Sequence, residues 1–212
     1  MTFTVICLVA TVTYAQNGAK DLLDKVAAKV ESYNNLEIEF NHVFENVEAD
    51  IKQEARGKVL LKKELYHLYY MGTEQIFDGS KTYLIIHEDE EVIIQNIEDM
   101  EAEENITPSK LFSFYKNGYT YKMGGLKTVN GIKTQEVILY PIDSDSSVDN
   151  IIVAIDNITN HIYSISETGK NSSKTVLTIR SMKTNQPISE KLFIFDDNKY
   201  RVEKNYTISE PN

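Results

Sequence analysis

The sequence predicts a mainly β fold with helices, in which one long antiparallel sheet curls or closes. Two observations lead to this prediction. From residue 36 onward, apolar and polar residues alternate with a period of two in about ten short segments, as in strands that bury one face. Turn residues separate these segments: Asn130-Gly131 predicts a type I′ hairpin, and Asp78-Gly79 marks a second turn. A sheet with so many strands does not stay flat, so its concave side must hold side chains, helices or a ligand.

A helix is predicted before the sheet, over residues 19–33, because apolar residues such as Leu22, Val26 and Val30 recur every three or four positions. The strands are predicted over residues 36–41, 58–62, 65–71, 82–87, 92–97, 119–123, 134–140, 150–155, 161–166, 174–182 and 191–195. A second, short helix is predicted over residues 108–115, since Thr107 is a suitable N-cap and Pro108 suits the first helical position.

The first fifteen residues contain no charged side chain and end at Ala15. The apolar run 6–12 is too short to cross a bilayer, so residues 1–15 are expected to be a signal peptide that is cleaved after Ala15. Cys7, the only cysteine, lies in this segment. Residues 16–212 would then form one exported domain without a thiol. The alternative is that the segment is a buried N-terminal strand or helix.

The formal net charge of the chain is −10, and all of it falls outside residues 1–15. An acidic surface repels the phosphates of nucleic acids and the head groups of anionic lipids. The composition therefore argues against nucleic-acid binding and against stable residence on a membrane. Transient membrane contact is compatible with it.

No catalytic or metal-binding motif is recognisable in the sequence. The four histidines, His42, His67, His87 and His161, are dispersed among separate predicted strands without the spacing of metal ligands. There is no HExxH motif, Gly-rich phosphate loop or GxSxG elbow. We therefore expect neither an enzyme nor a cofactor, while a Ser-His-Asp site distributed along the chain stays open as an alternative.

Several short motifs follow the predicted N-terminal helix in a recognisable order. In chain order they are Ile38-Glu39-Phe40, Gly57-Lys58-Val59-Leu60-Leu61-Lys62, Ile76-Phe77-Asp78-Gly79-Ser80-Lys81-Thr82-Tyr83-Leu84-Ile85, Thr107-Pro108-Ser109-Lys110-Leu111-Phe112, Leu139-Tyr140-Pro141, Ile155-Asp156-Asn157 and Phe193-Ile194-Phe195. The turn and strand that begin at Asp78 are the most specific of them. The series covers almost the whole mature chain and resembles the periplasmic outer-membrane lipoprotein carrier proteins (LolA-like proteins), in their divergent Bacteroidetes form.

The resemblance implies an unclosed antiparallel β-barrel whose opening is covered by the N-terminal helix and the short inserted helix. It implies a monomeric periplasmic chaperone that binds the acyl chains of lipoproteins in a hydrophobic concavity and carries them from the inner to the outer membrane. The implied partners are acylated lipoproteins and a lipoprotein-releasing ABC transporter of the inner membrane, and an outer-membrane acceptor is left open. The resemblance implies no enzyme activity, metal or cofactor.

Two positions depart from the pattern of the family. Its members commonly have Arg-Pro after the Gly-containing strand, where this chain has Lys63 and Glu64. The family's arginine is thought to latch the helical lid, and Lys63 supplies the charge without the guanidinium fork. Lys63 is therefore a candidate latch, or else an exposed charge at the strand end. Tyr83 stands where a tryptophan is common and can still line an apolar cavity.

Candidate cavity residues follow from the alternation along the predicted strands and from the inserted helix. We expect the lipid-binding cavity to be lined by Ile38, Phe40, Leu60, Tyr66, Leu68, Tyr70, Tyr83, Leu111, Phe112 and Phe114. The last three belong to the inserted helix, which is expected to pack as a lid against Leu22, Val26 and Val30. Plain core packing is the alternative for each of these residues.

Three other functions remain open at this stage. A related binding module could carry another lipid or a glycolipid. A secreted hydrolase would need a polar cluster at the mouth of the curled sheet. An exported scaffold protein would have a sheet interior filled by its own side chains.

Overall fold

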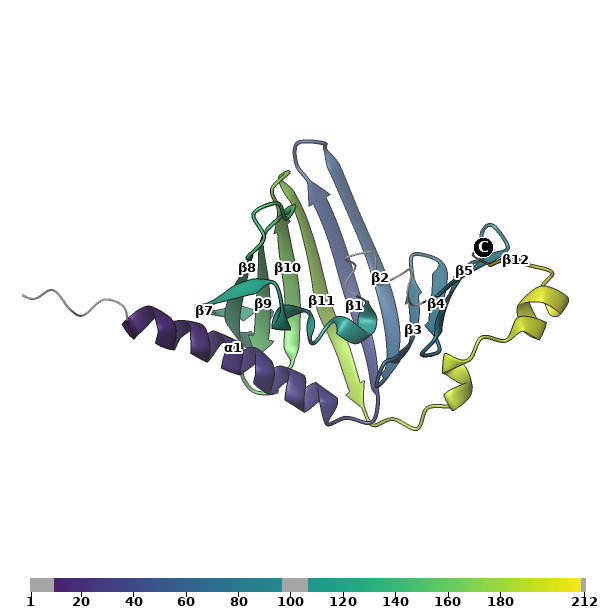
Figure 1. The fold of residues 1–212 in the computed structure, drawn as a ribbon, viewed down its shortest axis with the longest axis horizontal. Coiled ribbons are helices and arrows are strands. Elements are labelled where there is room, and N and C mark those ends of the chain that lie inside the picture. Colours follow the sequence, from purple (N-terminus) through teal and green to yellow (C-terminus); the bar gives the residue numbers. More distant parts are fainter. Residues whose placement is uncertain (1–9, 97–106, 211–212) are drawn as a thin grey trace, which may run out of the picture. The chain divides into compact units, whose positions relative to one another are not determined.

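The computed structural model describes residues 10–96 and 107–210 (Figure 1). The helix α1 spans Ala10–Glu31. The strands are β1 Leu36–Asn46, β2 Ile51–Lys62, β3 Leu65–Tyr70, β4 Thr73–Phe77, β5 Lys81–Ile86, β6 Glu91–Asn96, β7 Tyr119–Val129, β8 Ile132–Pro141, β9 Val148–Asp156, β10 Ile162–Gly169, β11 Ser173–Thr184 and β12 Thr207–Ser209. The short helical turns are η1 Pro108–Lys110, η2 Phe114–Lys116, η3 Glu190–Phe193 and η4 Asn198–Glu203.

The twelve strands form one hydrogen-bonded sheet in the order β12-β6-β5-β4-β3-β2-β1-β11-β10-β9-β8-β7. The strands at its two edges, β12 and β7, do not pair with each other, so the sheet is not closed. This confirms the predicted fold class. The order also shows two meanders, β1–β6 and β7–β11, which join through the pairing of β1 with β11 rather than following one another continuously.

The chain forms two compact units. Among the described residues, the first comprises residues 10–30, 44–52 and 115–177, and the second comprises residues 31–43, 53–96, 107–114 and 178–210. Three strands, β1, β2 and β11, contribute residues to both units. The single domain predicted for residues 16–212 stays a prediction.

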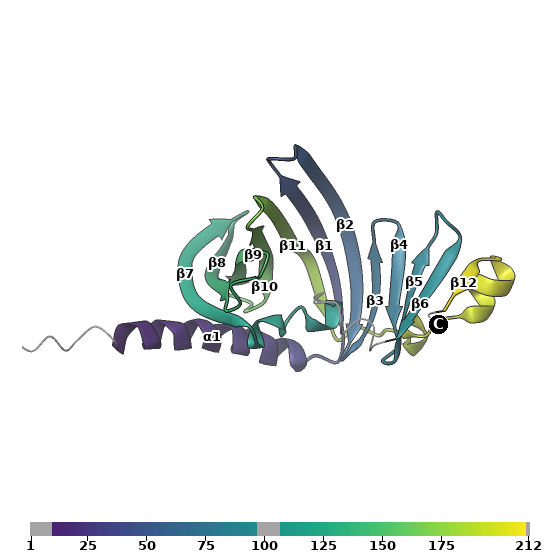
Figure 2. The ribbon, with the colours of Figure 1, turned by 45° about the horizontal axis from the view of Figure 1, so that its top comes forward.

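In the first unit, α1 runs along one face of the second meander (Figures 1 and 2). Leu23, Val26 and Ala27 of α1 are buried, as the predicted apolar spacing requires. The hydroxyl of Tyr115 donates a hydrogen bond of 2.8 Å to the carboxylate of Asp24. Residues 1–9 of the predicted signal peptide, including Cys7, lie outside the described residues, and α1 begins at Ala10 rather than at residue 19.

The sheet of the first unit buries a block of aliphatic residues on one face. Val137 pairs with Val153 and Leu139 pairs with Ile151 across β8 and β9, and all four are at most 1% exposed. The β7–β8 hairpin turns at Asn130-Gly131 with φ values of 51° and 82°. Both values are positive, as a type I′ turn requires, so the predicted hairpin is confirmed.

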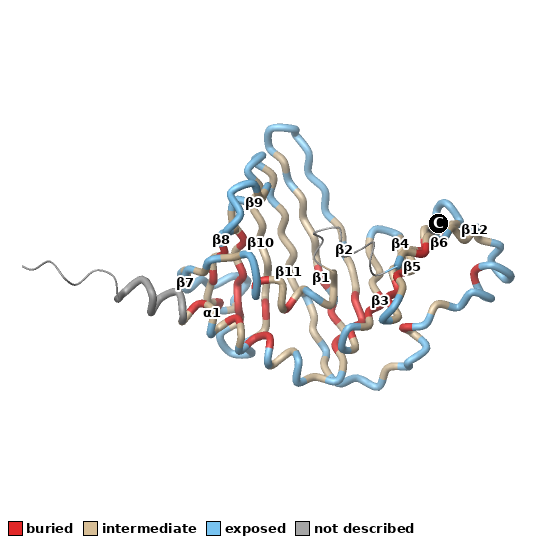
Figure 3. The backbone as a smooth tube through the Cα atoms, viewed as in Figure 1, coloured by how far each residue is buried: buried red, intermediate tan, exposed pale blue. Residues whose placement is uncertain are grey.

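In the second unit, residues 195–209, which we call the C-terminal segment, cover one face of β4–β6. Tyr200 is buried with Ile76, Ile85, Val92 and Ile94 in one cluster. The segment ends in β12, which pairs in parallel with β6. Figure 3 shows the buried parts of these strands in red beside exposed turns. The antiparallel meander predicted from the sequence contained neither β12 nor β4.

Two predicted elements are corrected by the structure. The helix expected over residues 108–115 is instead two separate turns, η1 and η2, because the side chain of Thr107 makes no cap hydrogen bond to the backbone. Its hydroxyl lies 3.1 Å from that of Ser109. The strand expected over residues 191–195 is the helical turn η3, because the Ser189 side chain caps it by accepting a hydrogen bond from the Lys191 amide.

Gly57 on β2 leaves room for the ring of Phe40. A Cβ atom added at Gly57 would lie 2.2 Å from Cζ of Phe40, well inside van der Waals contact. The Phe40 ring therefore lies across the β2 backbone, with its centroid 5.9 Å from that of Tyr70. Phe40 is only 8% exposed, so its ring cannot swing freely into water.

We expect Gly57→Ala to lower the free energy of unfolding by about 1–3 kcal/mol, the usual effect of overpacking. Urea unfolding followed by circular dichroism measures this change. The double variant Gly57→Ala/Phe40→Leu should recover part of the loss, because the smaller side chain vacates the space. Gly125→Ala is the control, since an added Cβ there meets no atom within 4 Å. Equal stability of the two Ala variants would contradict the packing described for Phe40.

Candidate functional site

One face of the sheet in the second unit carries rows of apolar residues across β2–β6. The middle row follows the strand register, from Val59 to Leu68, Gln75, Leu84 and Ile93. Residues that face one another across strands contact directly, so each row forms a continuous strip of side chains. We call this surface the apolar face.

The apolar face is closed at one end and open at the other. At the closed end, Tyr66 is 1% exposed and Phe77 is 7% exposed, and their rings stack with centroids 5.5 Å apart. Farther along the same strands, Leu68, Leu84 and Ile86 are only half-buried. Apolar surface is therefore available toward the open end, next to the β3–β4 turn.

An aromatic cluster lies at the open end of the apolar face. The Tyr70 hydroxyl is 2.7 Å from Nδ1 of His42, and the two rings meet edge to face with centroids 5.6 Å apart. Burial lowers the pKa of His42, which keeps its ring neutral near pH 7, so Nδ1 can accept the Tyr70 hydrogen. The cluster orients Tyr70 beside Phe40.

The opposite face of the same strands is already packed. Tyr83 stacks on Phe195 with centroids 4.5 Å apart, and Phe195 stacks on Tyr200 at 5.4 Å. Because successive residues of a strand point to opposite sides, Tyr83 and Leu84 belong to different faces. Only the apolar face retains half-buried aliphatic side chains in its middle row.

The predicted cavity residues divide between the two faces. Tyr66, Leu68 and Tyr70 share the apolar face, as expected from their alternation. Leu60 pairs with His67, and Tyr83 pairs with Ile76, which places both on the packed face. The sequence could not separate them, because Leu60-Leu61 and Tyr83-Leu84 are consecutive apolar residues that fit either alternation.

The remaining predicted residues differ in burial. Ile38 is 1% exposed and Phe112 is 6% exposed, while Leu111 and Phe114 are half-buried. The turn η1 lies against β3. Lys63 is exposed in the β2–β3 turn with a φ of 54°, and its role as a latch stays a prediction. Its neighbour Lys62, rather than Lys63, forms an ion pair with Glu190 of η3.

Three side chains that the sequence leaves dispersed meet on the packed face. The Glu74 carboxylate lies 2.9 Å from Nε2 of His67 and 2.9 Å from Nε2 of His87, with one oxygen facing each ring. The hydroxyls of Tyr69 and Tyr206 lie 3.3 Å and 3.2 Å from the other ring nitrogens of His67 and His87. Only strand pairing brings β3, β4 and the end of β5 together, so sequence spacing gave no signal for this cluster.

Glu74 is strongly stabilised as a carboxylate. Its pKa is lowered from 4.5 to about 2, first by the hydrogen bond from His67 and then by that from His87, which together outweigh the opposing effect of burial. The cluster therefore holds a negative charge that two imidazole N–H groups satisfy. Among the described residues, no group of three or more His, Cys, Asp or Glu side chains is arranged to hold a metal ion.

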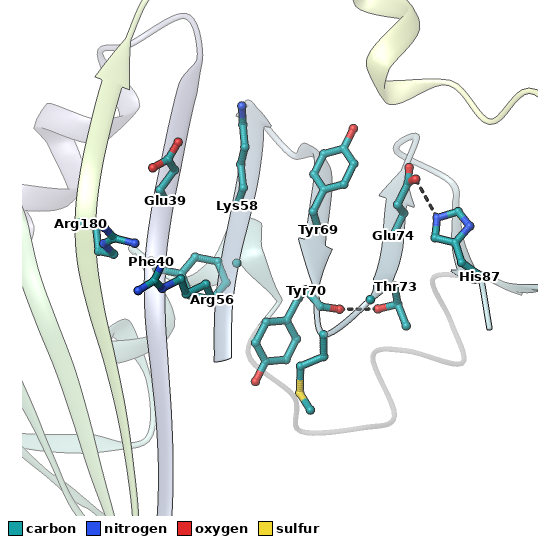
Figure 4. Close-up of a pocket in the computed structure, with 13 residues that line it drawn as sticks. Glu39, Phe40, Arg56, Lys58, Tyr69, Tyr70, Thr73, Glu74, His87 and Arg180 are labelled. Carbon is teal, nitrogen blue, oxygen red and sulfur yellow. Dashed lines mark hydrogen bonds and ion pairs between the residues drawn. The ribbon is translucent and has the colours of Figure 1, made fainter. Parts of the chain in front are cut away.

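A pocket of about 460 Å³ lies beside the β3–β4 turn of the second unit. Its lining includes side chains from six strands or their ends, among them Arg180, Glu39, Arg56, Lys58, Tyr69 and Glu74. Figure 4 shows Tyr69 and Tyr70 pointing in opposite directions, as their alternation requires, and Glu74 facing His87. The pocket thus combines charged side chains with the apolar side chains of Phe40, Tyr70 and Met71.

Solved structures share this fold at low sequence identity. An uncharacterized conserved protein from Thermus thermophilus has a TM-score of 0.61 and 8% identity, covering 92% of this chain and 99% of that protein. The lipoprotein LppX from Mycobacterium tuberculosis has a TM-score of 0.54 and 13% identity, covering 82% and 98%. These two similarities establish the fold and nothing finer.

A LolA superfamily protein from Nitrosomonas europaea is also similar, with 10% identity over 84% of this chain and 98% of that protein. Its TM-score is 0.44. No protein-family model and no curated protein matches the chain in sequence. The Bacteroidetes-type subgroup stays a prediction.

The part of the chain that the structure describes contains no helix long and apolar enough to cross a membrane.

We expect Glu74→Gln to lower stability at pH 7 and to change its dependence on pH. Because the folded-state pKa of Glu74 is depressed to about 2, its ionised form stabilises the fold above about pH 4.5, and this contribution is lost as the pH falls toward 2. The stability difference between wild type and variant should therefore shrink by ~1.4 kcal/mol per pH unit across that window. Urea unfolding at a series of pH values measures it.

Glu64→Gln is the matched control, because Glu64 is exposed in the β2–β3 turn. Its unfolding profile should follow that of the wild type. A Glu74→Gln difference that stays constant from pH 7 to about pH 2 would contradict the role assigned to the two histidines.

Proposed function

We propose that this protein is a carrier that shields the acyl chains of lipoproteins on the apolar face. The observation that supports this most is the half-buried middle row around Leu68 and Leu84, on a sheet whose other face is already packed. A surface of this kind is complementary to a flexible hydrocarbon chain. Tyr66 at the closed end would limit how deep an acyl chain can lie, and the chain would enter at the open end.

The energetics make such shielding necessary for transport through water. Transfer of hydrocarbon from a membrane to water costs ~0.8 kcal/mol per CH₂, so one long acyl chain costs on the order of 10 kcal/mol to expose. A carrier must recover most of this by contact with the chain. It must also release the chain again, which requires that binding and release states differ only modestly in affinity.

The finer function follows the resemblance noted in the sequence. We propose a periplasmic, monomeric and non-enzymatic chaperone that takes lipoproteins from a lipoprotein-releasing ABC transporter and delivers them to the outer membrane, with or without a dedicated acceptor. Residues 1–15 would direct its export. Lys63 would contribute to the latch of the lid formed by Leu111, Phe112 and Phe114.

A second candidate cargo is another lipid or a glycolipid. Gln75 interrupts the middle row between Leu68 and Leu84, and Thr73 pairs with Tyr70 in the neighbouring row. These polar groups could contact a hydroxyl or sugar that a plain acyl chain lacks. This observation favours a cargo with a polar portion, and analysis of bound material separates it from the first proposal.

Mass spectrometry of residues 16–212, expressed in a periplasm and purified without detergent, identifies what the protein binds. We expect acylated lipoproteins in near-stoichiometric amounts. A free lipid or glycolipid would instead favour the second cargo. A ligand-free protein that also fails to take up an added triacylated lipopeptide would contradict both proposed cargoes and favour a scaffold role.

Leu68→Glu should lower lipopeptide loading by at least about tenfold while export continues. The physical reason is that an unpaired carboxylate in the middle row loses its hydration when a chain covers it, at a cost above the ~1.4 kcal/mol that equals tenfold in affinity. Leu126→Glu is the matched control, because Leu126 is 72% exposed on β7. Loading that is equal in both variants would remove the apolar face from the proposal.

A further inference from the structure

Strand β2 runs past the end of its neighbour β3 (Figures 1 and 2). Pairing between the two strands starts at Gly57, which faces Tyr70, and beyond Tyr70 the chain turns into β4. Residues 53–56 of β2 therefore have β1 on one side and, among the described residues, no strand on the other. At roughly 3.3 Å per residue, this open edge is about 13 Å long.

The hairpin turn after β3 shows which backbone groups face the open edge. Tyr70 and Thr73 pair across a two-residue turn, in which the C=O of the first residue points to the N–H of the fourth. The backbone groups of Tyr70 thus face β4, and by alternation those of Tyr69 face β2. Tyr69 is opposite Lys58, so the backbone groups of Lys58 and, two residues away, of Arg56 face the β3 side. The N–H and C=O of Arg56 therefore point to the open edge, where the described part of the chain offers no strand to pair with them.

Two cavities lie along the open edge. The pocket of about 460 Å³ is lined there by Gly57 of β2 and by Met71 and Gly72 of the β3–β4 turn. A second cavity, of about 310 Å³, is lined by residues 41–43 of β1 and 54–56 of β2. A segment bound beside β2 would therefore have room for its backbone and for alternate side chains.

The second cavity is lined by a residue with a buried acceptor that lacks a donor. Oδ1 of Asn41 is shielded from solvent and accepts no hydrogen bond from the described residues. Leaving a buried polar atom unpaired is costly, and most such atoms in folded proteins have a partner. An N–H group of a segment bound in this cavity would supply the missing donor. The atom therefore indicates a ligand that carries N–H groups.

The open edge begins where the apolar face has its open end. Tyr70, the last residue of β3, belongs to the apolar face and stands opposite Gly57, next to the unpaired stretch of β2. An acyl chain that enters at this end would leave its head there, so a polypeptide attached to the head would emerge beside residues 53–56. Attachment to a bound chain keeps such a segment at a high local concentration near the edge.

We propose that the open edge of β2 binds, as an added β-strand, the polypeptide that follows the acylated residue of a lipoprotein. An added strand is held by main-chain hydrogen bonds. These bonds do not depend on the identity of the side chains, so the same edge can hold lipoproteins of different sequence. The inference rests on the proposed carrier function and adds to it a second contact, with the peptide part of the cargo.

A pair of lipopeptides tests the site. Both consist of a triacylated cysteine followed by six Ser and Thr residues, and in one of them these six residues are N-methylated, which removes their N–H donors. Wild-type protein should bind the unmethylated lipopeptide at least about fivefold more tightly, as measured by competition with a fluorescent lipopeptide. Only the unmethylated lipopeptide should slow hydrogen exchange at the Arg56 amide, which NMR measures.

Arg56→Pro removes the N–H that faces the open edge, a position at which a strand tolerates proline. The preference for the unmethylated lipopeptide should fall below about twofold, while the methylated one binds as it does to the wild type. Thr128→Pro is the matched control. Val129 and Ile132 pair across the two-residue turn after β7, so by the same alternation the N–H of Thr128 faces the free edge of β7. This variant should keep the full preference.

The outcomes separate this site from the carrier function. Equal binding of both lipopeptides by the wild type would leave the carrier function standing and show that the inference is wrong. If neither lipopeptide binds, the proposed function itself fails and the inference fails with it. A full preference in Arg56→Pro would exclude this edge, and if that variant does not fold, the exchange rate of the Arg56 amide in the wild type decides. A dimer in sedimentation that Arg56→Pro abolishes would show that a second copy occupies the edge instead.

Discussion

Apolar side chains on both sides of β2–β6 are the constraint on which the second unit depends. Consecutive residues of a strand face opposite sides, so pairs such as Leu60-Leu61 and Tyr83-Leu84 require that both faces be shielded from water. The C-terminal segment meets this need on one face through Phe195 and Tyr200. The other face stays half-buried beyond Tyr66. This asymmetry turns an ordinary sheet into a surface that can accept an apolar ligand.

The Glu74 cluster explains how a charged group is tolerated on the packed face. An ionised carboxylate away from water is costly unless donors satisfy its oxygens. His67 and His87 supply one N–H each, and Tyr206 faces the second nitrogen of His87 from the C-terminal segment. The cluster thus joins three strands to the segment that covers them, and its geometry explains why the pKa of Glu74 is so low.

Fold and function are specified by different residues in this protein. Solved structures with 8% and 13% identity share its architecture, so the sheet tolerates almost complete replacement of its side chains. Function must therefore be argued from particular groups. Here the group is the half-buried aliphatic row of the apolar face, which suits a ligand with an apolar chain.

The sequence by itself determined the open antiparallel sheet, the N-terminal helix and the Asn130-Gly131 hairpin, because period-two alternation, helical spacing and turn residues are local properties. It also placed Tyr66, Leu68 and Tyr70 on one face. It misassigned residues 108–115 and 191–195, where helix capping rather than periodicity decides the conformation. Only the tertiary structure separated Leu60 and Tyr83 from the apolar face and assembled the Glu74 cluster. Those outcomes depend on strand order and register, which join residues far apart in the chain and leave no trace in local sequence.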